Sequence, residues 1–235
     1  YQWQFGDLGA ATIADPSFTL TNTSTAVKPV QVDLVASNRF GCNAPMFSQT
    51  INVQPEIKAE FSLSNAAGCA PLTYTIAAPP TAGTYTWDIN GVTSTGNSQT
   101  ITVNDNETGS TQYYNITLIA SNGTCADTSA VKMVAVYPEV EAKWNPDLIP
   151  ATCSPLNLTI NNTSTLYNST AVLSDVFWEL TDGGTFNISS IDQSVTQQLL
   201  NPGYELPKDY TLTLTARSAD GCSNQKTSTI TVNPP

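Results

Sequence analysis

The sequence predicts an all-β protein made of tandem antiparallel β-sandwiches in an extended array. Three observations support this fold class. A set of landmarks recurs in one order along the 235 residues, apolar residues alternate with threonine in several segments, and no window has a convincing helical period. Serine and threonine supply 55 residues and charged residues only 11%, which excludes a coiled coil and a charged disordered tail.

Each repeat is recognised by a tryptophan, a strand that ends near a late cysteine, and a closing Val-x-Pro, and the second and third repeats also have an early cysteine. The tryptophans are spaced by 84 and 91 positions, and the Val-x-Pro tripeptides begin at Val53, Val136 and Val232. We therefore divide the chain into a first repeat (residues 1–54), a second repeat (55–137) and a third repeat (138–235). The first repeat is expected to be partial, with its first strands upstream of Tyr1.

The strand of each repeat that precedes the late cysteine is the clearest local pattern. In residues 210–216 the apolar side chains of Tyr210, Leu212, Leu214 and Ala216 alternate with threonine. Because successive side chains of a strand point to opposite faces, this pattern predicts one buried face and one row of threonines in water. Residues 114–120 and 30–36 repeat the arrangement, so each repeat is expected to contain this strand.

Five cysteines follow the same repeat. The second and third repeats have an early and a late cysteine, which predicts the disulfides Cys69–Cys125 and Cys153–Cys222. The first repeat has only the late Cys42, whose partner is expected upstream of Tyr1. Each bond would stabilise its domain by about 4 kcal/mol in the chain-entropy model and would imply an extracytoplasmic location. The alternatives are free buried thiols or a metal site, and the lack of Cys-x-x-Cys and of histidine disfavours the latter.

The segment Trp3-Gln4-Phe5-Gly6-Asp7, with a later Val-x-Leu-x-Ala-x-Asn and a closing Thr-Ile-x-Val, resembles the PKD repeat. The second repeat keeps Trp87, Asp88 and Gly91, and the third keeps Trp178, Asp182 and Gly183. The resemblance implies Ig-like β-sandwiches. The added Gly-Cys-x-Pro-Leu and Asn-x-x-Gly-Cys elements look like PKD arrays of Bacteroidota surface proteins, including SprB-type gliding adhesins exported by type IX secretion, which implies an extracellular, cell-surface location.

The tryptophans are expected to be structural. Trp3, Trp87 and Trp178 are predicted to lie in the core, as in other sandwiches of this kind, and exposed carbohydrate-stacking platforms are the alternative. Trp144 and Phe61 occupy matching positions just after the Val-x-Pro tripeptides. We expect both to pack near a domain junction, with a ligand contact as the alternative.

The carboxylates favour structural turns. Asp7, Asp88 and Asp182 lie in glycine-containing turns, where an Asp side chain accepts hydrogen bonds from the turn backbone. The alternative is Ca²⁺ bound at loops or junctions, and its candidate ligands are Asp105, Glu107, Asp147, Asp175 and Asp182. The chain has no Asp-x-Asp-x-Asp-Gly loop, and we expect no other cofactor.

Composition excludes several function classes. The chain has no histidine, which removes Ser-His-Asp and Cys-His catalysis, and the scattered carboxylates differ between repeats, so we expect no enzyme. A net charge of −11 argues against nucleic-acid binding, and no apolar run is long enough to span a membrane. The Asn-x-Ser/Thr sequons, which include Asn22 and Asn106, matter only in a host that glycosylates them.

These observations favour a structural role. We expect a stalk or spacer segment of a large surface adhesin or filament, which projects an adhesive or motile tip and has neighbouring repeats as its main partners. The alternative is a set of accessory modules that help a secreted hydrolase engage polysaccharide or protein, and lateral association of repeats into a sheath is a third reading. Exposed aromatic residues on one face would favour binding to surface polysaccharide or proteins, and the candidates are Tyr85, Tyr113, Tyr137, Tyr167 and Tyr204.

Overall fold

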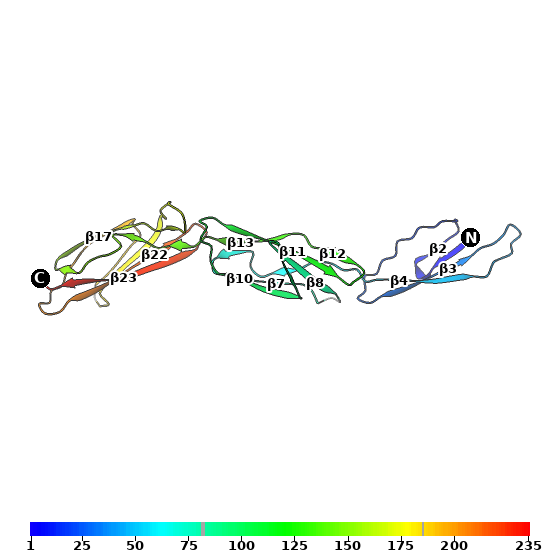
Figure 1. The fold of residues 1–235 in the computed structure, drawn as a ribbon, viewed down its shortest axis with the longest axis horizontal. Coiled ribbons are helices and arrows are strands. Elements are labelled where there is room, and N and C mark those ends of the chain that lie inside the picture. The colour runs from blue at the N-terminus through cyan, green and yellow to red at the C-terminus, as the bar shows by residue number, and fades with distance from the viewer. Residues whose placement is uncertain (81–82, 185) are drawn as a thin grey trace. The chain divides into compact units, whose positions relative to one another are not determined.

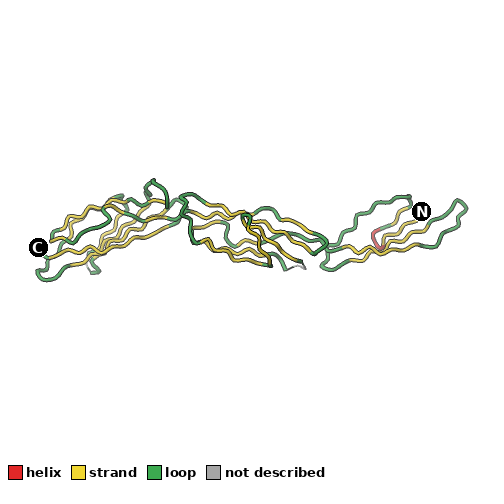
Figure 2. Tube along the Cα trace, viewed as in Figure 1, coloured by secondary structure: helices red, strands yellow, loops and turns green. Residues whose placement is uncertain are grey.

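The computed structural model describes residues 1–80, 83–184 and 186–235. The protein is all-β and consists of tandem Ig-like β-sandwich modules (Figure 1). Figure 2 shows that strands and loops make up the described chain apart from one short 3₁₀ segment, η1 (Gly6–Leu8). Helical structure in the described residues never reaches the length and hydropathy of a membrane span.

Contacts between Cα atoms divide the chain into two compact units. One comprises Tyr1–Ser62, Ile76–Gln99 and Ile116–Lys132, and the other comprises Leu63–Thr75, Thr100–Asn115 and Met133–Pro235. Both units draw residues from the second repeat, and the three-repeat division itself stays a prediction.

The first repeat forms a single four-stranded sheet in the order β2-β1-β3-β4. Trp3 lies opposite Ala11 on one side and Leu34 on the other. The strands are β1 (Gln2–Phe5), β2 (Ala10–Ala11), β3 (Lys28–Val35) and β4 (Phe47–Val53).

The second repeat contains two sheets. One has the order β10-β7-β5, and the other has the order β6-β13-β11-β8-β9 with β12 paired to β11. The strands are β5 (Ser62–Leu63), β6 (Ala67–Cys69), β7 (Leu72–Ala77), β8 (Thr84–Ile89), β9 (Val92–Thr95), β10 (Ser98–Val103), β11 (Gln112–Ser121), β12 (Ala126–Thr128) and β13 (Lys132–Tyr137).

The third repeat has a three-stranded sheet β15-β17-β21, a five-stranded sheet β16-β23-β22-β19-β20 and a small pair β14-β18. The last two long strands, β22 and β23, pair along ten residues. The strands are β14 (Val140–Glu141), β15 (Trp144–Asn145), β16 (Thr152–Cys153), β17 (Leu156–Asn162), β18 (Thr165–Leu166), β19 (Asp175–Thr181), β20 (Asn187–Ser190), β21 (Ser194–Leu199), β22 (Lys208–Arg217) and β23 (Ser223–Asn233).

The alternation predicted for residues 210–216 is confirmed in β22. Leu212, Leu214 and Ala216 are fully buried and belong to one core cluster with Ile160 and Ile230, whereas the threonines between them are exposed or half-buried. The matching strand β3 of the first repeat is different, because Val32 and Leu34 are only half-buried. An apolar face is covered only where a second sheet packs on it.

The same reason corrects the expectation for Trp3. Trp87 and Trp178 have at most 1% of their surface exposed. Their indole Nε1 atoms donate to the carbonyl oxygens of Gly96 (2.8 Å) and Asp192 (2.9 Å), respectively. Trp3 is only half-buried, and a surface cavity of about 500 Å³ lies against it and Met46. Within the described residues 1–54 there is one sheet, so no facing layer covers this ring.

Phe61 and Trp144 are core residues beside the central tryptophans. The Phe61 ring packs edge-on against Trp87 with centroids 5.2 Å apart, and Trp144 lies 6.0 Å from Trp178. Lys132 lies over the Phe61 ring and Lys226 over the Trp144 ring, with their Nζ atoms 4.6 and 4.5 Å from the centroids. Both rings are buried, which leaves no open face for a ligand at these two positions.

Candidate functional site

The three repeats share a buried asparagine in the loop before their long strand. Asn22, Asn106 and Asn201 are exposed by only 5%, 1% and 4%. Each Oδ1 accepts the amide of the residue two positions later, and each Nδ2 donates both to a carbonyl of its own loop and to the valine near the end of the last strand. The valine contacts are Asn22 with Val53 (2.8 Å), Asn106 with Val136 (2.8 Å) and Asn201 with Val232 (2.9 Å).

This asparagine also holds the start of the next repeat. The backbone N–H of Glu56, directly after Pro55, donates to the carbonyl of Asn22 at 3.0 Å. In the same way, Glu139 N donates to Asn106 O at 3.1 Å, and the Glu139 carboxylate accepts the Asn106 amide at 3.1 Å. One residue therefore fastens its loop to the last strand with its side chain and binds the following repeat with its backbone.

Sequence reasoning missed this role and treated Asn22 and Asn106 only as sequon asparagines. The missed pattern is a fixed spacing, because the asparagine lies 31, 30 and 31 residues before the valine of Val-x-Pro. In the folded chain both N–H bonds of the Asn106 amide are engaged, at Ser110 O (2.9 Å) and Val136 O. These buried amides are not accessible to a modifying enzyme.

The second and third repeats meet through two loops of the same compact unit. The side chain of Asn168 donates from Nδ2 to the carbonyl of Glu107 at 2.6 Å, and Tyr167 N donates to Glu139 O at 2.9 Å. Gly109 lies so close to the backbone of Tyr167 that a Cβ at position 109 would be 2.7 Å from Tyr167 O. The Glu107 carboxylate raises the pKa of the Tyr167 hydroxyl. The contact between the two loops therefore requires glycine at position 109, because a larger side chain would collide with Tyr167.

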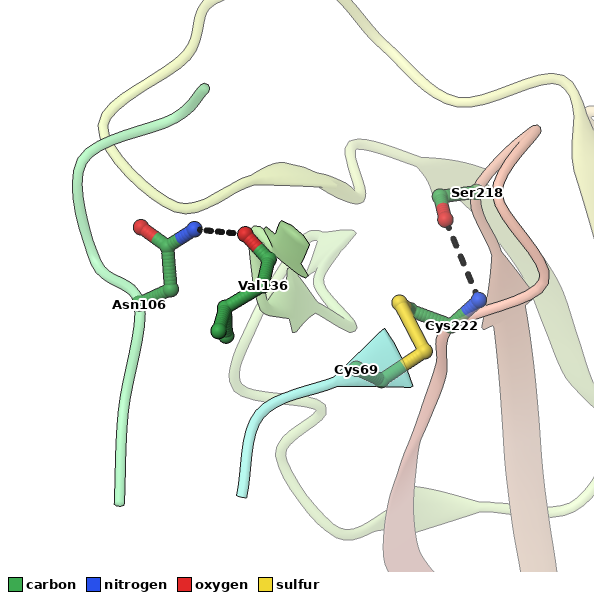
Figure 3. The surroundings of a disulfide bond; sticks show 5 residues. All are labelled: Cys69, Asn106, Val136, Ser218 and Cys222. Carbon is green, nitrogen blue, oxygen red and sulfur yellow. Dashed lines mark hydrogen bonds between the residues drawn. A yellow bond between two sulfur atoms is a disulfide. The ribbon is translucent and has the colours of Figure 1, made fainter. Parts of the chain in front are cut away.

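A disulfide links the same two repeats. Cys69 of β6 bonds to Cys222, which precedes β23, and their Cα atoms are 5.5 Å apart (Figure 3). Cys222 is buried in the core cluster of the third repeat, and Cys69 packs against that cluster. Figure 3 also shows Asn106 bonded to Val136 near this disulfide. The repeats are thus held together covalently and by hydrogen bonds.

This pairing corrects the expected disulfides Cys69–Cys125 and Cys153–Cys222. Cys153 lies beside Asn233 at the end of β23, whereas Cys222 lies just before its start. The eleven residues of β23 separate them by roughly 35 Å at about 3.3 Å per residue, and a disulfide needs Cα atoms within about 7 Å. Cys69 likewise lies beside Tyr137 at the end of β13, whereas Cys125 precedes β12.

The remaining cysteines are free and exposed, namely Cys42, Cys125 and Cys153. The upstream bond expected for Cys42 stays a prediction. The turn around Cys42 matches the one around Cys222. In both, the first residue of the turn donates its N–H to the cysteine carbonyl, from Asn38 at 3.0 Å and from Ser218 at 2.8 Å, and a positive-φ glycine precedes the cysteine.

The acidic candidates serve turns and ion pairs. Asp88 accepts the Gly91 amide at 2.7 Å, and Asp7 lies exposed in η1. Asp182 accepts from Gly184 (2.9 Å) and Phe186 (3.0 Å) and pairs with Lys208 Nζ at 2.8 Å. The hydrogen bond from Lys208, followed by the one from Gly184, lowers the pKa of Asp182 to about 2. Asp182 also raises the pKa of Lys208.

The structure does not bring the Ca²⁺ candidates together. Asp147 pairs with Lys226, and Asp182 pairs with Lys208. Asp105 and Glu107 lie exposed in one loop, and Asp175 lies exposed at the start of β19. Over residues 1–80, 83–184 and 186–235, no three acidic or cysteine side chains gather in a way that could hold a metal ion. The five tyrosines also differ in exposure: Tyr85 is buried, Tyr137 and Tyr167 are half-buried, and Tyr113 and Tyr204 are exposed.

Comparison with known proteins identifies a PKD-like domain at residues 55–136. The structure is similar to the fibronectin(III)-like modules of Clostridium thermocellum CbhA, at 12% identity and a TM-score of 0.33, over 74% of this chain and 95% of that one. It is similar to chicken CNTN1 domains FN1–FN3, at 11% identity and a TM-score of 0.32, over 87% of this chain and 78% of that one. It is also similar to a Ca²⁺-stabilised adhesin that helps an Antarctic bacterium reach out and bind ice. The identity is 12% and the TM-score 0.32, over 88% of this chain and 57% of that one. A search of the curated proteins found no match.

Proposed function

We propose that this chain is a stalk segment of an extracellular surface protein, in which tandem modules act as a stiff spacer that carries an adhesive or motile tip. The observation that carries the proposal is the junction between the second and third repeats. There the Cys69–Cys222 disulfide acts together with the hydrogen bonds from Asn106 N to Glu139 Oε1 and from Asn168 Nδ2 to Glu107 O. A flexible tether would need none of these bonds, whereas a spacer under load benefits from all of them.

The disulfide supports an oxidising, extracytoplasmic location, because such bonds persist outside the reducing cytosol. The PKD-like match of the second repeat agrees with it. The finer proposal is a giant adhesin of the SprB type that is exported by type IX secretion and displayed on the cell surface. It is supported by the resemblance of the cysteine-bearing repeats to those arrays. An accessory module of a hydrolase would need a row of exposed aromatics, and burial of Tyr85 weakens that alternative.

Stiffness of this junction is the property to measure. Residual dipolar couplings of the ¹⁵N-labelled full chain report one alignment tensor for amides 55–137 and one for 138–235. We expect the two tensors to coincide in the wild-type chain and to diverge when the disulfide and the hydrogen bond from Asn168 to Glu107 are removed together in a Cys69→Ser, Asn168→Ala variant.

The matched control is Asn104→Ala, an exposed asparagine of the loop that carries Glu107. It should leave the two tensors coincident. Separate tensors in the wild-type chain would mean that the two repeats tumble independently, and the stalk proposal would then fail. For the location, an antibody against this segment should label intact cells, and recovery of the antigen only from the culture medium would contradict surface display.

A further inference from the structure

We propose that the end of the third repeat that carries Cys153 is a docking surface for another PKD-like module. A disulfide would join Cys153 to a hairpin cysteine of that module, which is a cysteine in the turn before the last strand, as Cys222 is in the third repeat. This docking end consists of Cys153, Asn201, the loop from Leu200 to Leu206 and the end of β23. The proposal goes beyond the stalk function, because an accessory module could assemble through the same surface.

The docking end repeats the construction of an end that is already occupied. In the second repeat, β6 pairs in parallel with β13 and places Cys69 beside Tyr137, and Cys69 is bonded to Cys222 of the third repeat. In the third repeat, β16 pairs in parallel with β23 and places Cys153 beside Asn233. The Cys153 thiol is free and exposed.

The loop beside each cysteine is also equivalent. Asn106 and Asn201 anchor the loop to the end of the last strand at 2.8 and 2.9 Å. In the second repeat this loop contacts the next module, through the Glu107 carbonyl and Asn168. In the third repeat the amide of Asn201 is bonded to Ser154, the residue next to Cys153, at 3.0 Å, so the loop and the thiol form one surface.

The loop of the docking end is unusually apolar for an exposed segment. Leu200, Tyr204 and Leu206 have 51%, 86% and 75% of their surface exposed. Exposed apolar side chains that gather on one loop mark a candidate interaction site, since burying them against a partner lowers the free energy. A partner module seated here would bury them beside the new disulfide.

The occupant is defined by the cysteine that fills the equivalent place. Cys222 stands in a tight turn in which Ser218 N donates to Cys222 O (2.8 Å) and Gly221 N donates to Ser218 O (3.0 Å). The turn at Cys42 has the same two bonds, Asn38 N to Cys42 O (3.0 Å) and Gly41 N to Asn38 O (3.1 Å). Cys42 is free and exposed, so a second copy of this chain presents a suitable hairpin cysteine.

The bond forms by thiol–disulfide exchange. With glutathione disulfide as the oxidant, the Cys42 thiolate first attacks it, which yields a Cys42–glutathione mixed disulfide and releases one glutathione thiolate. The Cys153 thiolate then attacks the Cys42 sulfur and releases the second glutathione. Two protein thiols are oxidised to one disulfide, and one glutathione disulfide is reduced to two thiols.

The test is to incubate the full chain in a glutathione redox buffer and to map intermolecular disulfides by mass spectrometry. We expect Cys153–Cys42 peptides to dominate and Cys153→Ser to remain monomeric. Tyr204→Ala with Leu206→Ala should lower the initial rate of this crosslink by about threefold or more, because docking raises the effective concentration of the two thiols. Ile191→Ala, also a highly exposed apolar residue, is the control and should leave the rate unchanged.

Three outcomes would overturn the proposal: Cys153–Cys153 dimers as the main product, crosslinks among Cys42, Cys125 and Cys153 in random proportions, or equal rates for the loop variant and Ile191→Ala. The Cys69–Cys222 bond, mapped in the same digest, reports whether each variant is folded. Because the readout is a crosslink map and not the alignment tensors, its failure would leave the stalk proposal standing.

Discussion

Asn106 donates its side-chain Nδ2 to the backbone carbonyl of Val136 at 2.8 Å, across 30 residues of sequence and in a fully buried position. The same bond recurs in all three repeats, and in the first two the backbone carbonyl of the same asparagine accepts the amide that follows the linker proline. The stability of a module and the attachment of its successor therefore depend on one residue.

Replacing Asn106 with alanine should destabilise the chain by about 2–3 kcal/mol. The variant removes the Asn106 donor from the carbonyl of Val136 in a buried place, and an unsatisfied buried group costs more than an exposed one. Urea unfolding monitored by tryptophan fluorescence measures the change. The exposed Asn104→Ala is the control, and equal midpoints for the two variants would refute a special role for Asn106.

Non-reducing peptide mapping should find Cys69 linked to Cys222. Cys69→Ser should then lower stability by up to about 5 kcal/mol in the chain-entropy model, since the bond closes a loop of 153 residues. Cys125→Ser is the control, because Cys125 is free and exposed, and should have almost no effect. Recovery of linked 69–125 and 153–222 peptides would instead restore the pairing within repeats.

Gly109→Ala should be costlier than an alanine at another left-handed glycine. Gly109 has φ +77° and Gly91 has φ +84°, so both variants incur backbone strain of about 1 kcal/mol. Only at Gly109 would the new Cβ meet an atom, Tyr167 O at 2.7 Å, whereas Gly91 faces open space. Differential scanning calorimetry compares Gly109→Ala with Gly91→Ala. Equal melting temperatures would show that the contact between Gly109 and Tyr167 does not contribute to stability.

The ion pair between Asp182 and Lys208 should stabilise the fold only within a pH window. The pKa of Asp182 is lowered from 3.8 to about 2 in the folded chain, so the contribution is complete above about pH 5 and is lost as the pH falls from there toward 2. The raised pKa of Lys208 means that the contribution is also lost at high pH, as the pH rises beyond 10.5.

Melting temperatures of wild type and Asp182→Asn measured between pH 2 and 8 check this window. The difference between the two proteins should be constant above about pH 5 and should shrink below pH 4. Asp220→Asn, in an exposed turn, controls for the change in net charge. A difference that does not shrink between pH 4 and pH 2 would show that the pair does not titrate in this way.

Local features of the fold were predictable because they depend on neighbouring residues. Alternation from Tyr210 to Ala216 placed a strand and its buried face, and the repeated tryptophans identified Trp87 and Trp178 as core residues. The prediction failed for Trp3, because burial of a ring depends on the sheet opposite it and not on its own strand.

The sequence by itself determined the all-β class, the repeat and the residues that alternate between core and solvent, since these follow from the two-residue period of a strand. Only the tertiary structure decided which cysteines meet. The parallel pairing of β6 with β13 and of β16 with β23 places each early cysteine at the end of its sandwich, a strand length away from the late one in the third repeat. Spacing along the chain does not encode that distance. Cys69 bonds to Cys222 of the next repeat because the fold brings these two residues together.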